Sequence, residues 1–179
     1  MERYIKEVLV TKEEIAATVK RIGKQITEDY KGQKLLLIGV LKGGSVFLAD
    51  LIREIDLPIQ IDFIAVSSYG ASTKSSGVVK LIKDIDIPIN DTHVIIVEDI
   101  VDTGLTLKYL KELFQTRNPL SVKICSIFDK PSRRVTDIVP EYCGITIPNE
   151  YVIGYGLDFG GILRNLPDLC ILKEEFYNK

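Results

Sequence analysis

The residues best placed for chemistry lie just after an apolar run at positions 93–97. Two adjacent carboxylates, Glu98 and Asp99, come first, and a third, Asp102, follows. The next residues begin an expected helix: Thr103, Gly104, Leu105 and Thr106. Hydroxyls and unpaired amides at a helix N-terminus bind a phosphate dianion, whereas carboxylates beside it would repel that anion unless they bound sugar hydroxyls or a metal. A phosphorylated sugar satisfies both requirements, because its phosphate suits the helix start and its hydroxyls suit the carboxylates. Alternatively, Asp102 or Thr103 only caps the helix and the acidic pair is a solvated turn.

A second strand-to-helix junction, at positions 39–45, could also hold an anion. Its sequence Gly-Val-Leu-Lys-Gly-Gly-Ser is a near match to a Walker A loop, but Ser45 stands where that loop has its lysine, which disfavours an NTPase. Lys42 and the amides of Gly43 and Gly44 still form an anion-binding turn on physical grounds. An ordinary connecting turn is the alternative.

The spacing of apolar residues predicts the elements that position these groups. Thr11 and Glu14 form a capping box, and the apolar residues behind it predict one helix that stops at Gly32: Ile15, Val19, Ile22 and Ile26. Apolar runs predict strands over residues 35–41, 59–66, 78–82, 93–97 and 122–128, with helices over 45–55 and 104–116. This alternation indicates an α/β domain with a mostly parallel sheet, whose ligands bind at the carboxyl ends of the strands.

Composition limits the possible function classes. The chain has 179 residues, no linker or repeat that divides it, and a formal charge of −2, so no global basic field exists to bind nucleic acid or an anionic membrane. No stretch approaches the roughly 20 apolar residues of a membrane helix, and charges interrupt the N-terminus before a signal sequence can form. Cys125, Cys143 and Cys170 lack disulfide or zinc spacing, which is typical of a reducing compartment. We expect a cytoplasmic protein with no nucleic-acid or membrane partner.

The run Val97-Glu-Asp-Ile-Val-Asp-Thr-Gly104 resembles the phosphoribosyl-pyrophosphate signature of the purine phosphoribosyltransferases, specifically their hypoxanthine–guanine branch. Five motifs occur in family order from about Gly39 to Arg164. The resemblance implies the α/β type I phosphoribosyltransferase fold, with a mostly parallel central sheet flanked by helices. Residues 1–179 would form a single domain whose small hood comprises the N-terminal segment and the residues after about 140. The resemblance also implies a homodimer or homotetramer.

On the pyrophosphate side, the resemblance assigns a loop, an arginine and a lid. The loop around Lys42 and Gly43 would receive pyrophosphate, through a Leu41–Lys42 peptide bond that can be cis, and Arg164 would contact the same group. Ser68 and Tyr69 begin a polar segment that would close over the reacting centre and exclude water. Composition alone also allows an ordinary surface loop there.

On the purine side, the resemblance implies that Lys130 donates to the exocyclic O6 and so selects a 6-oxopurine. Tyr151 would stack on the base, and the Val152 backbone would read its edge. Asp158 would lie near the metal and the 2-position of the purine. Without the resemblance, Lys130 is a typical solvated lysine and Tyr151 a typical core aromatic.

The implied reaction joins a 6-oxopurine to phosphoribosyl pyrophosphate, with Mg²⁺ as cofactor, to give IMP or GMP and pyrophosphate. Glu98 and Asp99 would hold the ribose hydroxyls and, together with Asp158, the metal. Residues 103–106 would hold the 5-phosphate. Asp102 would act as the general base that takes the proton from N7 of the purine.

Two alternatives stay open at the level of sequence. A regulator with the same fold would bind phosphoribosyl pyrophosphate without catalysis and could dispense with the lid and with Lys130. A transferase for xanthine or adenine would differ in its base, and residues 159–161, where relatives vary, bear on that breadth. His93 matches no motif, so we predict a structural role for it.

Overall fold

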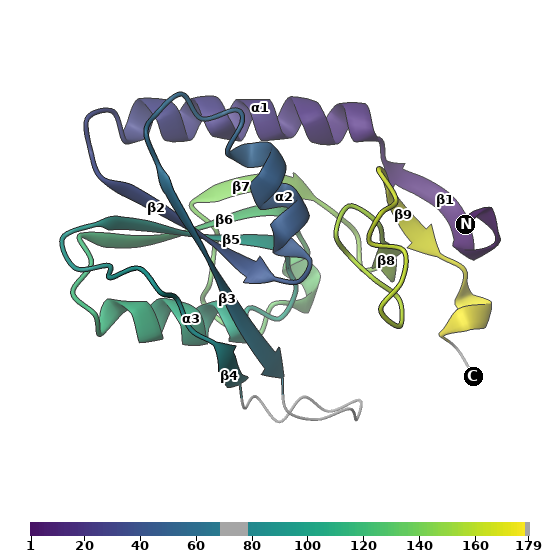
Figure 1. The fold of residues 1–179 in the computed structure, drawn as a ribbon. Coiled ribbons are helices and arrows are strands. Elements are labelled where there is room, and N and C mark those ends of the chain that lie inside the picture. The colour runs from purple at the N-terminus through teal and green to yellow at the C-terminus, as the bar shows by residue number, and fades with distance from the viewer. Residues whose placement is uncertain (69–78, 178–179) are drawn as a thin grey trace.

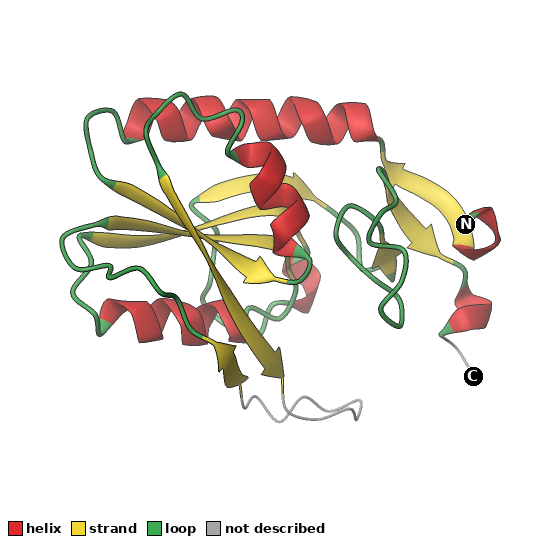
Figure 2. Cartoon of the chain, viewed as in Figure 1, coloured by secondary structure: helices red, strands yellow, loops and turns green. Residues whose placement is uncertain are grey.

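The computed structural model describes residues 1–68 and 79–177, and its centre is a six-stranded sheet with helices on both faces (Figures 1 and 2). The strand order is β4-β3-β2-β5-β6-β7, and β4 runs antiparallel to β3 while the other neighbours are parallel. The strands are β2 (Leu35–Leu41), β3 (Gln60–Ser68), β4 (Val79–Lys83), β5 (His93–Val101), β6 (Ser121–Asp129) and β7 (Tyr142–Thr146). Helices α1 (Lys12–Asp29) and α2 (Gly44–Leu51) cover one face and α3 (Leu105–Gln115) the other. The predicted α/β class is confirmed.

Alternate side chains of β2 fill two separate cores. Leu35 and Leu37 pack with side chains of α1 and α2, whereas Leu36 and Ile38 pack with those of α3. Successive side chains of a strand point to opposite faces, so a strand covered on both faces is apolar at every position. This explains why the predicted strand 35–41 has no polar residue, and its bounds are confirmed.

The capping box of α1 is present as predicted, and the predicted end of α2 is wrong. Thr11 Oγ1 accepts from the Glu14 amide, and the Glu14 carboxylate accepts from the Thr11 amide at 2.8 Å. Helix α2 ends at Leu51 rather than at position 55, because the Arg53 and Glu54 amides bond to carbonyls three residues back, and this tighter turn ends the α-helical pattern.

Strand β5 extends four residues beyond the predicted end at Val97. Its last part pairs with β6, so that Glu98 lies opposite Ser126 and Ile100 opposite Phe128. The backbone of Glu98 and Asp99 is therefore held by the sheet and not by a free loop. This ladder positions the acidic pair before any ligand arrives.

A second sheet, antiparallel and three-stranded, brings the two ends of the described chain together. Its order is β1-β9-β8, with strands β1 (Ile5–Val10), β8 (Val152–Ile153) and β9 (Leu169–Leu172). It lies to the right of the main sheet in Figure 1, beyond the carboxyl ends of the parallel strands. We propose that this small sheet is the hood; β7, although it follows position 140, belongs to the main sheet.

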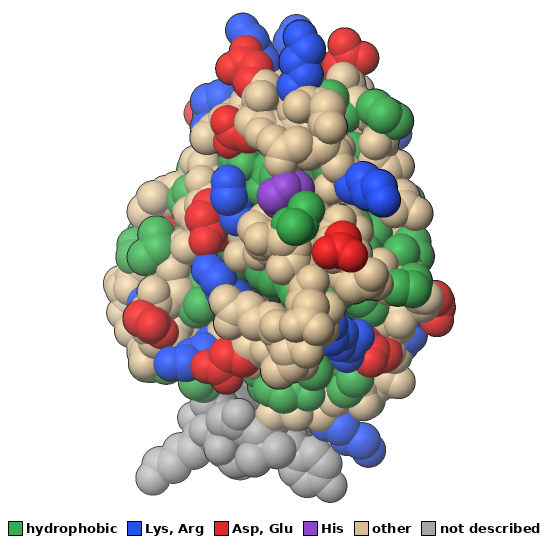
Figure 3. Space-filling view, turned by 90° about the vertical axis from the view of Figure 1, so that its left-hand side faces the viewer, with side chains coloured by type: hydrophobic (Ala, Val, Ile, Leu, Met, Phe, Trp, Pro, Cys, Tyr) green, Lys and Arg blue, Asp and Glu red, His purple; other side chains and the backbone are tan. Residues whose placement is uncertain are grey.

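The opposite end of the molecule, seen in Figure 3, carries cationic and anionic side chains interspersed around a histidine. The His93 Nδ1 atom lies 2.8 Å from Ser121 Oγ, and its ring packs edge-on against Tyr30. The cysteines of the chain are free thiols. None of the helices described within residues 1–68 and 79–177 combines the length and the apolar character that a membrane-spanning helix needs.

Candidate active site

The acidic pair Glu98 and Asp99 lies near the carboxyl end of β5, on the side of the small sheet. Asp99 is buried, and its Oδ1 accepts a 2.7 Å hydrogen bond from the Ile100 amide. Glu98 Oε1 accepts one of 3.2 Å from the Asp99 amide. Burial raises the pKa of both carboxyl groups, and the neighbouring Asp99 charge raises that of Glu98 further. A cation or several hydroxyl donors would relieve the cost of keeping both groups ionised.

The turn between β2 and α2 lies directly against Asp99. Its Leu41–Lys42 peptide bond is cis, and the Lys42 side chain is exposed. A Cβ built on Gly43 would overlap Asp99 Oδ2 and lie 2.8 Å from Asp99 Cγ and 3.1 Å from the Gly156 carbonyl oxygen. Any larger residue here would have to displace the Asp99 carboxylate, so the predicted pyrophosphate loop and the acidic pair are in contact.

A small cavity of about 170 Å³ lies at the N-terminus of α3. Its lining contains three of the four predicted phosphate residues, Thr103, Gly104 and Thr106, together with Glu98 and Asp102. Gly104, the N-cap, has φ of +84°, a left-handed conformation that glycine adopts without steric strain. Leu105 is the first residue of the helix, and its amide makes a long 3.5 Å contact with Thr103 Oγ1. Thr103, Gly104 and Thr106 thus line a space at the helix N-terminus that is suited to a phosphate group, whereas Leu105 is not part of the lining.

A larger cavity, of about 420 Å³, lies between the end of β6, strand β8 and the C-terminal turn. Its lining contains the predicted purine-side residues: Asp102, Lys130, Tyr151, Val152 and Asp158. Lys130 is only 7% exposed, and its Nζ donates a 2.8 Å hydrogen bond to the Glu150 carbonyl oxygen. Burial lowers the pKa of Lys130. Because an ammonium group has three donors, Lys130 can also donate to a ligand in this cavity.

Asp102 and Ile100 line both cavities, so the two spaces meet at the end of β5. Asp102 Oδ1 accepts a 3.1 Å ion-pair hydrogen bond from Arg133 Nε, and the Asp102 carbonyl oxygen accepts from Arg134 Nε at 3.1 Å. Arg134 also pairs with Asp129. Arg133 therefore orients the carboxylate, while Arg134 holds the backbone behind it.

Asp158 and Arg164 form an ion pair on the small-sheet side of the site. Asp158 Oδ1 lies 2.6 Å from Arg164 Nη2, and its Oδ2 accepts a 2.7 Å hydrogen bond from the Gly161 amide. Arg164 Nη1 donates to the Gly156 carbonyl oxygen at 2.6 Å. Across the two described ranges, no three His, Cys, Asp or Glu side chains gather closely enough to hold a metal. Asp158 is thus not grouped with the acidic pair, and its role as a metal ligand stays a prediction.

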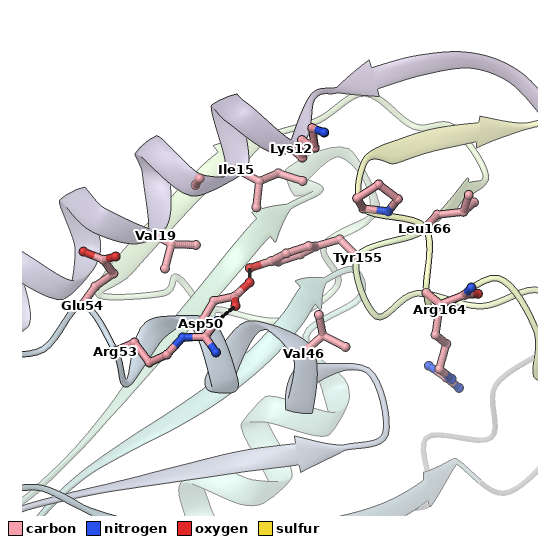
Figure 4. A pocket seen from close by; sticks show the side chains of 13 residues that line it. Lys12, Ile15, Val19, Val46, Asp50, Arg53, Glu54, Tyr155, Arg164 and Leu166 are labelled. Carbon is pink, nitrogen blue, oxygen red and sulfur yellow. Dashed lines mark hydrogen bonds and ion pairs between the residues drawn. The ribbon is translucent and has the colours of Figure 1, made fainter.

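A third cavity, of about 490 Å³, lies between α1, α2 and the loop that follows β8 (Figure 4). There the Tyr155 hydroxyl donates a 2.7 Å hydrogen bond to Asp50, which also pairs with Arg53. The Arg164 side chain extends away from this group in Figure 4. Of the predicted site residues, Arg164 alone lines this cavity, so the cavity adjoins the predicted site at that residue and shares none of its other groups.

One predicted residue, Tyr69, cannot be compared with the structure, and the sequence did not predict several residues that line the 420 Å³ cavity, Tyr177 among them. Ser68 is the last residue of β3, and Tyr69 lies outside the described residues. Tyr177 lines the 420 Å³ cavity although it belongs to no motif. The only sequence signal is an aromatic pair, Phe176-Tyr177, in an otherwise polar terminus.

The fold, the phosphate-sized cavity and the buried lysine together identify the class of protein. A family model described as a phosphoribosyl transferase domain matches residues 7–160, and the chain belongs to this family. Among curated relatives, the hypoxanthine-guanine phosphoribosyltransferases of Streptococcus thermophilus and Lactococcus lactis subsp. lactis are each 49% identical to the chain over 179 residues. These alignments cover 100% of this chain and 99% and 97% of the relatives.

Solved structures agree with this assignment. A hypoxanthine phosphoribosyltransferase from Staphylococcus aureus superimposes with a TM-score of 0.96 at 46% identity, over 100% of this chain and 97% of that one. The Trypanosoma cruzi enzyme, solved with its product IMP, has a TM-score of 0.90 at 42% identity, over 97% of each chain. The resemblance to the hypoxanthine–guanine branch is confirmed.

Proposed function

We propose that this protein is a hypoxanthine–guanine phosphoribosyltransferase of purine salvage. It transfers the phosphoribosyl group of phosphoribosyl pyrophosphate to hypoxanthine or guanine, and it releases IMP or GMP and pyrophosphate. The observation that carries the proposal is the junction of two cavities at Asp102 and Ile100. One cavity suits a phosphate and the other a purine, so a mononucleotide can span them with its ribose beside the acidic pair.

The sugar-phosphate half is bound by the end of β5 and the start of α3. The amides and hydroxyls of residues 103–106 receive the 5-phosphate, helped by the positive end of the helix dipole. Glu98 and Asp99 accept hydrogen bonds from the ribose hydroxyls. Because both carboxylates are held on the sheet, the sugar is positioned with little rearrangement of the protein.

Glu98 and Asp99 also fit Mg²⁺, because they are two adjacent carboxylates whose pKa values are raised mainly by burial, so that a bound cation would favour their ionised forms. Magnesium in nucleotide enzymes is commonly held by one or two carboxylates together with substrate oxygens and water. When bound, the ion supplies Lewis-acid stabilisation of the diphosphate charge. Glu98 and Asp99 would hold the ion as well as the ribose hydroxyls.

The purine half is recognised in the 420 Å³ cavity. Lys130 donates to O6 of the base, an interaction that a 6-amino group cannot accept, so the site selects 6-oxopurines. Tyr151 offers a flat apolar face for stacking, and the Val152 backbone reads the edge of the base. Asp158, which also lines this cavity, would face the 2-position of the purine.

Proton transfer is assigned to Asp102. Its carboxylate lies between the two cavities, and Arg133 holds it by a single 3.1 Å contact. As the bond to the anomeric carbon forms, Asp102 takes the proton from N7 of the purine. Negative charge that develops on pyrophosphate is stabilised by Lys42, the amides of the turn at Gly43 and the Arg164 guanidinium. A lid that begins at Ser68 and Tyr69 would exclude water from this centre.

A base-comparison assay tests the proposal. The protein is incubated with Mg²⁺, phosphoribosyl pyrophosphate and one base at a time, and both pyrophosphate and nucleotide are measured. Hypoxanthine and guanine are expected to react much faster than adenine. No pyrophosphate release with any base would identify a non-catalytic regulator, and preference for xanthine would change the substrate assignment. The homodimer or homotetramer and the cytoplasmic location stay predictions.

A further inference from the structure

The aromatic ring of Tyr177 lies parallel to the ring that we assign to purine stacking. The ring centroids of Tyr151 and Tyr177 are 5.0 Å apart with 18° between their planes. Tyr177 also lines the 420 Å³ cavity together with Lys130 and Val152. It is the last described residue of the chain, and neither the motifs nor the comparisons assign it a role.

The turn that carries Tyr177 is anchored to the beginning of the chain. The Lys173 amide donates a 2.9 Å hydrogen bond to the Tyr4 carbonyl oxygen. The Phe176 ring packs against Tyr4, with 4.7 Å between centroids, and against Phe159 at 6.2 Å. The short helix Glu174–Phe176 is thus held from both sides, and this fixes the ring that follows it.

We propose that Tyr177 is a positioning residue for the purine, forming the outer wall of the purine cavity and holding the Tyr151 ring in its stacking orientation. Tyr151 is 41% exposed, and among the described residues its aromatic contacts are Tyr177 and the edge of Phe159, 6.1 Å away. A half-exposed ring is held mainly by such neighbours. Loss of one of them frees the ring to rotate, and binding of a base must then also offset the entropy lost in ordering the ring again.

Tyr177 lines the purine cavity without filling it. The 420 Å³ volume exists with Tyr177 in place, and it falls within the range of about 300–1,000 Å³ of small-molecule sites. The phosphate cavity at α3 is lined only by residues 98–107, so Tyr177 does not contribute to it. Its effect should therefore fall on the purine and not on the phosphoribosyl donor.

The test is steady-state kinetics of the full-length protein with hypoxanthine and phosphoribosyl pyrophosphate, and it rests on the proposed function. We expect Tyr177→Ala and Tyr177→Leu to raise KM for hypoxanthine about 3- to 10-fold, the size of an aromatic-pair contribution. The KM for phosphoribosyl pyrophosphate and kcat should change less than about 2-fold. Tyr177→Phe keeps the ring and should behave as the wild type, as should Glu175→Ala, which truncates an exposed side chain on the same turn.

Each other outcome overturns the inference. An unchanged hypoxanthine KM would show that Tyr151 needs no support, and a lowered one would show that Tyr177 competes with the base. An equal rise in both KM values would indicate a general structural role. If Tyr177→Ala does not fold, the same comparison is made with Tyr177→Leu, which retains apolar contact. Wild-type protein that turns over no purine would instead refute the proposed function.

Discussion

Adding one methyl group at Gly43 should displace Asp99 and disable the site. Gly43 has φ of −63° and ψ of −44°, which alanine also adopts, so the substitution strains no backbone dihedral. The new Cβ would overlap Asp99 Oδ2 and stand 2.8 Å from Asp99 Cγ, where ordinary contacts begin at 3.4 Å. Asp99 Cγ must therefore move away by about 0.6 Å. Asp99 Oδ2 must move farther, because the new Cβ would take the place that this oxygen occupies.

The displacement has a predictable size in both stability and activity. It disrupts the 2.7 Å hydrogen bond from the Ile100 amide to Asp99 Oδ1, and a hydrogen bond to a charged group contributes about 1.5–3 kcal/mol. Misplacement of a positioning group by about 1 Å lowers rates about 100-fold. We expect Gly43→Ala to lower the melting temperature by about 3–10 °C and to lower kcat/KM for phosphoribosyl pyrophosphate about 100-fold.

Two further variants separate the steric cause from a general effect of alanine. Gly32→Ala places a methyl group in open space and should leave catalysis unchanged, with only the backbone strain of its φ of +76°. In an Asp99→Ser background the overlapping carboxylate is absent, so adding Gly43→Ala should lower the melting temperature little beyond Asp99→Ser alone, while activity stays low in both proteins. The measurements are thermal unfolding and steady-state kinetics. Gly43→Ala protein with wild-type kcat/KM would refute the reasoning, because the turn would then not be in contact with Asp99.

Three other predictions concern the charged groups of the site. Lys130→Met should raise KM for hypoxanthine about 10- to 100-fold through loss of a charge-assisted hydrogen bond. Burial lowers the pKa of Lys130, so in the wild type this lysine loses its charge at a lower pH than an exposed lysine does. The wild-type kcat/KM for the purine should therefore begin to fall below the pH at which an exposed lysine titrates. Asp102→Asn should bind both substrates but lose about 10²–10⁴-fold in kcat, measured by single-turnover kinetics. Glu98→Gln should abolish most activity yet raise the free energy of unfolding of the ligand-free protein by about 0.5–2 kcal/mol at about pH 7.5. The raised pKa of Glu98 means that its carboxyl group binds a proton more tightly in the folded state than in the unfolded state. The contribution of this group to the free energy of unfolding therefore falls as pH rises. The stabilisation by Glu98→Gln should accordingly shrink when unfolding is measured near about pH 5.

Each of these predictions has an outcome that would contradict it, and the lysine variant also has a matched control. Lys20→Met changes an exposed lysine on α1 and should leave the purine KM unaltered; equal effects of the two lysine variants would remove Lys130 from base recognition. Near-normal kcat for Asp102→Asn would exclude Asp102 from proton transfer. A Glu98→Gln protein less stable than wild type under the same mildly alkaline conditions would mean that the acidic pair is not under electrostatic strain.

Much of the fold follows from local sequence. The capping box at Thr11 and the continuous apolar run 35–41 predicted their elements correctly, because hydrogen bonds and periodicity within one segment determine them. The predicted ends of β5 and α2 were wrong because contacts between distant parts of the chain determine them. Pairing of Glu98 with Ser126 across the sheet, and the tight turn at Arg53, depend on where the chain packs and not on which residues are adjacent.

The candidate site divides in the same way. The sequence by itself determined that Glu98, Asp99 and Asp102 lie between a buried apolar segment and a helix start, since a strand-to-helix junction is a local feature with recognisable chemistry. Only the tertiary structure decided that Gly43 presses on Asp99, that the phosphate and purine cavities meet at Asp102, and that the last turn of the chain reaches Tyr151. Contacts between residues that lie far apart in the chain arise from packing of whole elements, and packing leaves no signal in the spacing of any one segment.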